Sequence, residues 1–146
     1  MLVGGGVALV SLRPLAPREA DRLTYDQAFR AIAGGREPTD GRVTLELPKI
    51  AETGNSVPIT VRADSPMTPD DHVARLHVLS MGNPRPNVAT FHLGPRAGLA
   101  EVGTRIKLSR TQQVVAVAEM SDGSLWRDQA SIVVTLGACV EEIWLD

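Results

Sequence analysis

The feature that most constrains the fold is a series of strand-length runs that fill the chain from residue 43 to residue 136. Apolar residues alternate with polar ones or cluster in each run, and the runs cover residues 43–47, 57–61, 74–79, 88–93, 104–108, 113–120 and 125–136. Pro, Gly and Asn occupy the gaps, and Asp122-Gly123 between the last two runs is a strong hairpin signal. The pattern predicts a mainly β chain folded as an antiparallel β-sandwich.

One short helix precedes these runs. Thr24 and Gln27 form a capping-box pattern, in which the threonine hydroxyl accepts from the N–H three residues on and the glutamine reaches back. Apolar residues follow at helical spacing, and Gly34-Gly35 favours a left-handed stop. We therefore predict an amphipathic helix over residues 25–33 and a turn-rich link at residues 37–41.

Composition excludes some classes of function. The 146 residues fit a single domain, the net charge is -2 and aromatic residues make up 3%. Such a chain has no basic field for nucleic acid and no platform on which bases stack. Nucleic acid is therefore not an expected partner, and the core must be built from aliphatic side chains.

The first twelve residues, MLVGGGVALVSL, are apolar, rich in glycine and uncharged. This run is too short to cross a bilayer as a helix, but its length and small side chains suit the apolar region of a signal peptide. We expect residues 1–20 to be the remnant of an export signal and the mature protein to have no membrane segment. A disordered tail or an early strand is the alternative.

Cys139 is the only cysteine, so the chain cannot form an internal disulfide. It follows the last run after two small residues, Gly137 and Ala138, which predicts a slender, flexible C-terminal arm over residues 137–146 with an exposed thiol. The alternative interpretation is a buried, inert cysteine.

The surroundings of Cys139 do not favour catalysis by the thiol itself. No histidine lies within ten residues of it, and the adjacent carboxylates of Glu141 and Glu142 disfavour the thiolate. We therefore expect a covalent attachment point on which partner enzymes act, and no catalytic residue in this chain.

Several segments together resemble the SoxY family of sulfur carriers. Residues 48–59, PKIAETGNSVPI, are similar to the family's P-x-I-A-E-x-G-x-x-V-P segment, and residues 82–91 contain its G-N-P-x-P and A-T-F pieces. Residues 104–108, TRIKL, and 120–123, MSDG, match as well. The resemblance extends over residues 24–139.

The resemblance implies a fold, a role and a set of partners. SoxY proteins are periplasmic, immunoglobulin-like carriers without a classical cofactor, and they pair with SoxZ, a second small sandwich protein. A haem enzyme, a hydrolase and a sulfane dehydrogenase load, hydrolyse and oxidise their cargo during thiosulfate oxidation. The resemblance makes Cys139 the attachment residue of a sulfur intermediate and Gly137 and Ala138 the hinge of the arm. It also implies export by the twin-arginine route, followed by a carrier domain over residues 24–136.

The end of the chain departs from the family pattern. The family's arm usually ends in Gly-Gly-Cys-Gly-Gly, whereas Cys139 here is preceded by Gly-Ala and followed by the seven residues VEEIWLD. Three explanations stay open: a divergent paralogue that serves another partner, an altered gene end, or a tail that docks. In the third case, Ile143, Trp144 and Leu145 contact the chain's own sheet or a partner subunit.

Two other interpretations compete with sulfur carriage. The first is a plain interaction module, for which the turn at residues 83–86 offers a partner contact. The second is a metal-handling sandwich. Its candidate ligands are His72, His77, His92, Met67 and Met81, with His77 and His92 as cross-strand neighbours. No tight His/Cys spacing is present, which favours packing or surface roles for the histidines and no metal site.

Overall fold

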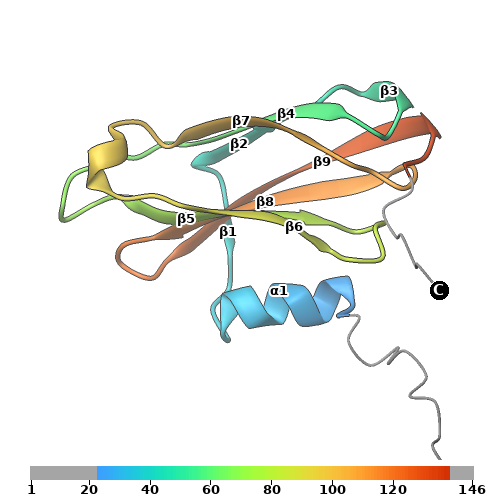
Figure 1. Ribbon diagram of the computed structural model, residues 1–146. Helices are drawn as coiled ribbons and strands as arrows, with labels where there is room; N and C mark the ends of the chain where they lie inside the picture. The colour runs from blue at the N-terminus through green and yellow to red at the C-terminus, as the bar shows by residue number, and fades with distance from the viewer. Residues whose placement is uncertain (1–22, 139–146) are drawn as a thin grey trace, which may run out of the picture.

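The computed structural model describes residues 23–138, which form three layers (Figure 1). A short helix lies against the outer face of a six-stranded sheet, and a three-stranded sheet covers the inner face of that larger sheet. The elements in chain order are α1 (Tyr25–Ala33), β1 (Thr39–Asp40), β2 (Val43–Glu46), β3 (Ile50–Thr53), β4 (Val57–Ala63), β5 (Val73–Ser80), β6 (Asn87–His92), η2 (Pro95–Ala97), β7 (Glu101–Ile106), β8 (Gln112–Met120) and β9 (Leu125–Leu136).

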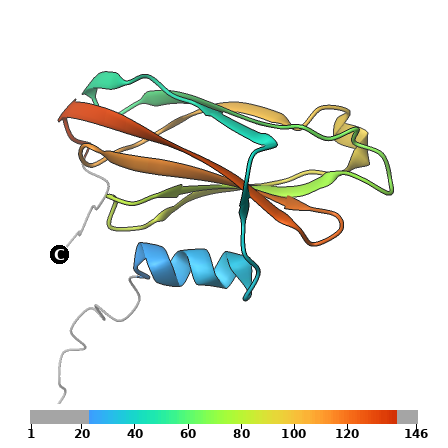
Figure 2. The ribbon, with the colours of Figure 1, turned by 180° about the vertical axis from the view of Figure 1, so that it is seen from behind.

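The two sheets are joined into an immunoglobulin-like sandwich. The larger sheet has the order β1-β9-β8-β5-β6 with β3 also on β9, and the smaller has the order β2-β4-β7. All pairs are antiparallel except the short pairs of β1 and β3 with β9. Residues 125–132 of β9 pair with β8, and its last residues pair with β3. Figure 2 shows β9, in red, running to the end of the sandwich where the arm begins.

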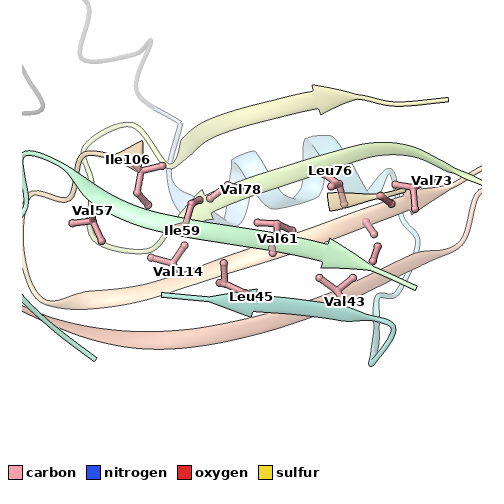
Figure 3. Packing of buried hydrophobic residues seen from close by; sticks show 14 of the residues in the cluster. Val43, Leu45, Val57, Ile59, Val61, Val73, Leu76, Val78, Ile106 and Val114 are labelled. Carbon is pink, nitrogen blue, oxygen red and sulfur yellow. The ribbon is translucent and has the colours of Figure 1, made fainter. Parts of the chain in front are cut away.

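The core lies between the two sheets and is aliphatic, as the composition predicts. Residues of β4 alternate between buried and exposed positions, and Val57, Ile59 and Val61 point inward. Figure 3 shows them facing Leu76 and Val78 of β5 within a single cluster. Full burial of one such side chain stabilises the fold by about 1.5–3 kcal/mol, so this cluster is the main source of stability.

The helix forms at the predicted residues because its caps are built locally. Both capping-box hydrogen bonds are present between Thr24 and Gln27, and Gly34 ends the helix at φ 57°. Ala28 and Ala33 are buried against a second apolar cluster that comprises Leu79, Val115, Val117 and Leu125 on the outer face of the larger sheet. Arg36, just after the helix, donates to the carboxylate of Glu119 at 3.0 Å and so fixes the helix to β8.

All seven predicted runs are strands, and the hairpin at Asp122-Gly123 is confirmed by Gly123 at φ 86°. The strand predicted at 104–108 begins and ends earlier in the structure, because β7 covers 101–106. Leu108 lies after the strand and makes backbone hydrogen bonds that are described below. The short strands β1 and β3 were not predicted. Strand β1 lies in the segment assigned to a turn-rich link, and both strands pair in parallel with a distant strand.

Two predicted segments lie outside the described residues: the export-signal remnant at 1–20 and the part of the arm that contains Cys139, Glu141 and Glu142. Among residues 23–138, no helix has the length and apolar character needed to cross a membrane.

Candidate functional site at the base of the C-terminal arm

The arm base, defined here as Gly137 and Ala138, directly follows β9. In Figure 1 the end of β9 lies at the same end of the sandwich as the β5–β6 and β7–β8 connections. Segments from three distant parts of the sequence therefore surround the residues that precede Cys139.

A ring of backbone hydrogen bonds joins these segments. Gly54 N–H donates to the carbonyl of Leu136 at 2.7 Å, and its own carbonyl accepts from Leu108 N–H at 2.9 Å. The carbonyl of Leu108 accepts from Ala138 N–H, also at 2.9 Å. Ala138 is buried, with 6% of its surface exposed. The chain is therefore held up to the residue bonded to Cys139.

The two glycines at this junction permit close backbone approach. A Cβ at Gly54 would overlap the carbonyl of Leu108, and a Cβ at Gly137 would overlap the carbonyl of Ser109. Neither glycine needs a positive φ. The first two residues of the predicted flexible arm are thus packed on the β7–β8 connection, and Gly137 has a packing role that sequence reasoning did not foresee. A hinge at Gly137 and Ala138 stays a prediction.

Asn83, in the β5–β6 connection, also fixes the β7–β8 connection. Its Oδ1 accepts from Ser109 N–H at 2.9 Å, from Ser109 Oγ at 3.1 Å and from Gln112 Nε2 at 3.0 Å. Its Nδ2 donates to the carbonyl of Lys107 at 2.9 Å. The sequence indicated only a rigid turn or a partner contact here. The one available signal was an amide side chain between Gly82 and Pro84, where a tight turn brings it close to backbone groups.

Thr111 ties the same connection to β9. Its Oγ1 accepts from Val134 N–H at 2.9 Å and lies 3.4 Å from the Val134 carbonyl. The hydroxyl therefore pairs with both backbone groups of Val134, as the backbone of a neighbouring strand would. The segment 107–112 therefore contacts both β9 and the arm base, while Asn83 holds its position.

A cleft with a cationic rim opens beside the arm base, between the edge strands β6 and β7. Its volume is about 640 Å³, and apolar side chains including Phe91 and Ile106 line it together with Arg85, Arg105 and Lys107. No carboxylate within residues 23–138 lies within 4.0 Å of these three cations. Lys107 immediately precedes Leu108, so the rim reaches the arm base.

The histidines do not come together as a metal site. His77 and His92 lie on the paired strands β5 and β6, but Thr90 is directly opposite His77 and Arg75 is directly opposite His92, so the two histidines are diagonal neighbours. The Nδ1 atom of His72 lies 3.0 Å from the Thr68 carbonyl, beside the β8–β9 hairpin at the other end of the sandwich. Within the described part of the chain, no group of three His, Cys, Asp or Glu side chains is arranged to hold a metal ion.

His77 belongs instead to a buried polar network on the outer face of the larger sheet. Its Nε2 lies 3.3 Å from a carboxylate oxygen of Glu119 and its Nδ1 lies 3.0 Å from Thr90 Oγ1. A neutral ring with its hydrogen on Nε2 satisfies both contacts. Burial lowers the pKa of His77 and outweighs the hydrogen bond and charge of Glu119, which raise it. Burial raises the pKa of Glu119, but hydrogen bonds from Arg36 and His77 and the charge of Arg75 hold it below its ordinary value.

Comparisons with known proteins agree with this architecture. The family model described as sulfur oxidation protein SoxY matches residues 29–139. The structure of the sulfur carrier protein SoxY from Chlorobium limicola f thiosulfatophilum is similar, with 28% identity, coverage of 76% of this chain and 96% of that one, and a TM-score of 0.64. No curated protein matches the sequence.

Superoxide reductases have a similar fold. The protein from Ignicoccus hospitalis (neelaredoxin) is 15% identical, with coverage of 64% of this chain and 80% of that one and a TM-score of 0.58. The protein from Nanoarchaeum equitans is 12% identical, with coverage of 66% and 100% and a TM-score of 0.55. At such identities the likeness shows the fold alone.

Proposed function

Because this chain belongs to the SoxY family of sulfur oxidation proteins, we propose that it carries sulfur intermediates covalently on Cys139. The proposal depends on one observation, the end of the family match. The match extends over residues 29–139, and residue 139 is the only cysteine of the chain. The residue before it, Ala138, is held by the hydrogen bond to Leu108, so the chain is fixed on the sandwich up to that residue.

The proposed loading step is an oxidative coupling. The sulfane sulfur of thiosulfate forms a sulfur–sulfur bond with the sulfur of Cys139, the thiol proton goes to solvent, and two electrons pass to a haem-containing partner enzyme. Hydrolysis by a second partner then breaks the bond between the sulfane sulfur and the sulfonate group. Water supplies the fourth oxygen of the released sulfate, two protons go to solvent, and a persulfide anion stays on Cys139. The carrier supplies no acid or base for these steps.

The electrostatics of the arm base support an anionic cargo. Arg85, Arg105 and Lys107 surround the neighbouring cleft without a carboxylate from residues 23–138 to neutralise them. Clustered charges of one sign raise the local concentration of the opposite ion. A thiosulfate ion is therefore attracted to this cleft.

The proposal includes a partner and a compartment. We expect a heterodimer with a SoxZ-like second sandwich, since among residues 23–138 the edge strands β6 and β7 each pair with a strand on one side only. We also expect the mature protein in the periplasm. Native mass spectrometry of the co-expressed pair and fractionation of cells test these two statements separately.

Reconstitution tests the carrier role directly. The purified protein is incubated with thiosulfate, a haem-containing loading enzyme of the sulfur oxidation system and an electron acceptor. A mass increase confined to the peptide that contains Cys139, absent from the Cys139→Ser variant, is the expected result. An unmodified thiol with a loading enzyme that modifies another SoxY protein in the same assay would contradict the proposal and leave a plain interaction module.

A further inference from the structure

Strands β3 and β9 carry an apolar surface that no other described residue between 23 and 138 covers. Ile50 and Val133 are 66% and 50% exposed, and they are two of the six exposed large hydrophobic residues between residues 23 and 138. Ile50 lies directly opposite Val133 in the parallel pair of β3 and β9, so both side chains point to the same, outer face. We call Ile50 and Val133, with the hollow beside them, the β3–β9 surface.

The hollow extends this surface toward β8. Its volume is about 550 Å³, and Ser131, Val133, Gln113 and Lys49 are among the residues that line it. Helix α1 covers the outer face farther along the sheet, where it packs on Val115 and Leu125, and it leaves the β3–β9 surface free. An apolar hollow beside exposed Ile and Val side chains is typical of a surface that another segment covers.

The sequence after the arm base has matching chemistry. After Cys139 the sequence reads VEEIWLD, so Ile143, Trp144 and Leu145 form an apolar group with carboxylates on both sides. Lys49 is the charged residue that lines the hollow, and its ammonium group complements those carboxylates. Glu52, on β3 two residues after Ile50, is the nearby acidic group that opposes them, so the apolar contact must provide most of the attraction.

The tail is long enough to reach this surface. Val133 lies five residues before Ala138, and five residues of chain extend at most about 18 Å. Ile143 lies five residues after Ala138, so it reaches back over the same span. Because the hydrogen bond of Ala138 to Leu108 fixes the starting point, only a short loop needs to be ordered.

We propose that residues 143–145 dock on the β3–β9 surface of their own chain. The docking does not depend on the proposed carrier function.

Tryptophan fluorescence tests the docking in the full chain. The protein has two tryptophans, so in a Trp126→Phe background Trp144 is the only one, and excitation at the red edge of the absorption band selects it over Tyr25. We expect blue-shifted emission and slow acrylamide quenching of Trp144. In the Val133→Asp variant, we expect both quantities to change toward the values of an exposed tryptophan. The milder Val133→Thr keeps the β-branched shape and gives a smaller change in the same direction. The matched control Leu99→Asp, at a residue 60% exposed between η2 and β7, leaves emission unchanged.

The other outcomes each contradict the proposal. Emission typical of exposed tryptophan in the unsubstituted background would mean that the tail does not dock. Equal shielding of Trp144 with and without Val133→Asp would mean that the tail docks elsewhere. Shielding of Trp144 that depends on protein concentration would mean that the tail docks on a second copy of the chain.

A second measurement avoids the change at Trp126. In a Cys139→Ser background, the thiol of Val133→Cys reports on access to the surface. We expect Trp144→Ala to raise its rate of alkylation by iodoacetamide several-fold, whereas an equal rate with and without Trp144 would overturn the proposal. Neither measurement reads sulfur carriage, so failure of the docking and failure of the carrier role are distinguishable.

Discussion

The backbone N–H of Ala138 donates to the carbonyl oxygen of Leu108 at 2.9 Å, and this bond ties the residue before the only cysteine to a connection between two other strands. The same connection is held by Asn83 and by the close approach of Gly137. The position from which Cys139 extends is therefore set by contacts that are far apart in the sequence, and each contact can be changed separately.

Substitution Gly137→Ala tests the close packing of the arm base. A Cβ at this position overlaps the carbonyl of Ser109, so the backbone must shift, and we expect a loss of about 1–3 kcal/mol in the free energy of unfolding. Urea denaturation measures the change. The control is Gly103→Ala in β7, where the nearest atom to a new Cβ, Thr60 Oγ1, is 3.9 Å away. Equal stabilities of the two variants would show that the approach of Gly137 to Ser109 is not restrictive.

Substitution Asn83→Ala tests the support of the β7–β8 connection. It removes the acceptor of three hydrogen bonds and leaves the N–H of Ser109 and the amide of Gln112 without this partner. Leaving such groups unsatisfied destabilises a fold by about 1–3 kcal/mol. Asn55→Ala, at an exposed site near the same junction, is expected to change unfolding by less than about 0.5 kcal/mol. If the two variants unfold at the same urea concentration, Asn83 does not have the role assigned to it.

The pH dependence of stability tests the buried histidine. The pKa of His77 is lowered in the folded state. Once the pH falls below about 6.5, the imidazole of His77 therefore binds a proton in the unfolded chain but stays neutral in the folded chain. Stability is therefore lost as the pH decreases below that value, by at most about 1.4 kcal/mol per pH unit. The lowered pKa of Glu119 adds a loss in the same direction at more acidic pH.

The substitution His77→Gln removes this titration and is expected to flatten the fall in unfolding free energy between pH 7 and pH 5.5. His92→Gln, at an exposed position of β6, serves as the matched control. A wild-type curve that is flat across this range, or the same slope in His77→Gln, would contradict the assignment of a neutral buried ring.

The cationic rim is tested through the rates of two thiol reagents. The double substitution Arg85→Gln and Lys107→Gln is expected to slow the reaction of Cys139 with an anionic aromatic disulfide by roughly two- to tenfold at low salt, and less at high salt. The reaction with neutral iodoacetamide is expected to stay within about 1.5-fold, since no steering acts on it. Arg96→Gln, which removes one exposed cation from η2, is the control. Equal slowing of both reagents would indicate a change in access and not in electrostatics.

The strands and the helix could be predicted because their signals are local. Alternating burial along β4, the capping box at Thr24 and the turn at Asp122-Gly123 each lie within a few neighbouring residues. Strands β1 and β3 could not be predicted, since each is a short piece that becomes a strand only by pairing in parallel with β9.

The arm base shows the same difference between local features, which could be predicted, and long-range contacts, which could not. A slender segment after the last strand was predicted from Gly137 and Ala138, but the partners Leu108 and Ser109 are not visible in a single sequence. The small size of Gly137 suggested freedom of movement, whereas in the structure it allows two backbones to touch. The role of Asn83 was missed for the same reason, because its side chain bonds to residues more than twenty positions away.

The intact mass of the protein purified from its native source, measured with and without reductant, shows whether Cys139 carries sulfur in the cell. We expect an adduct that reductant releases and that peptide mapping assigns to Cys139, with a mass that corresponds to added sulfur or to added sulfur and sulfonate. A population that consists entirely of unmodified free thiol, isolated from cells that are oxidising thiosulfate, would contradict this expectation.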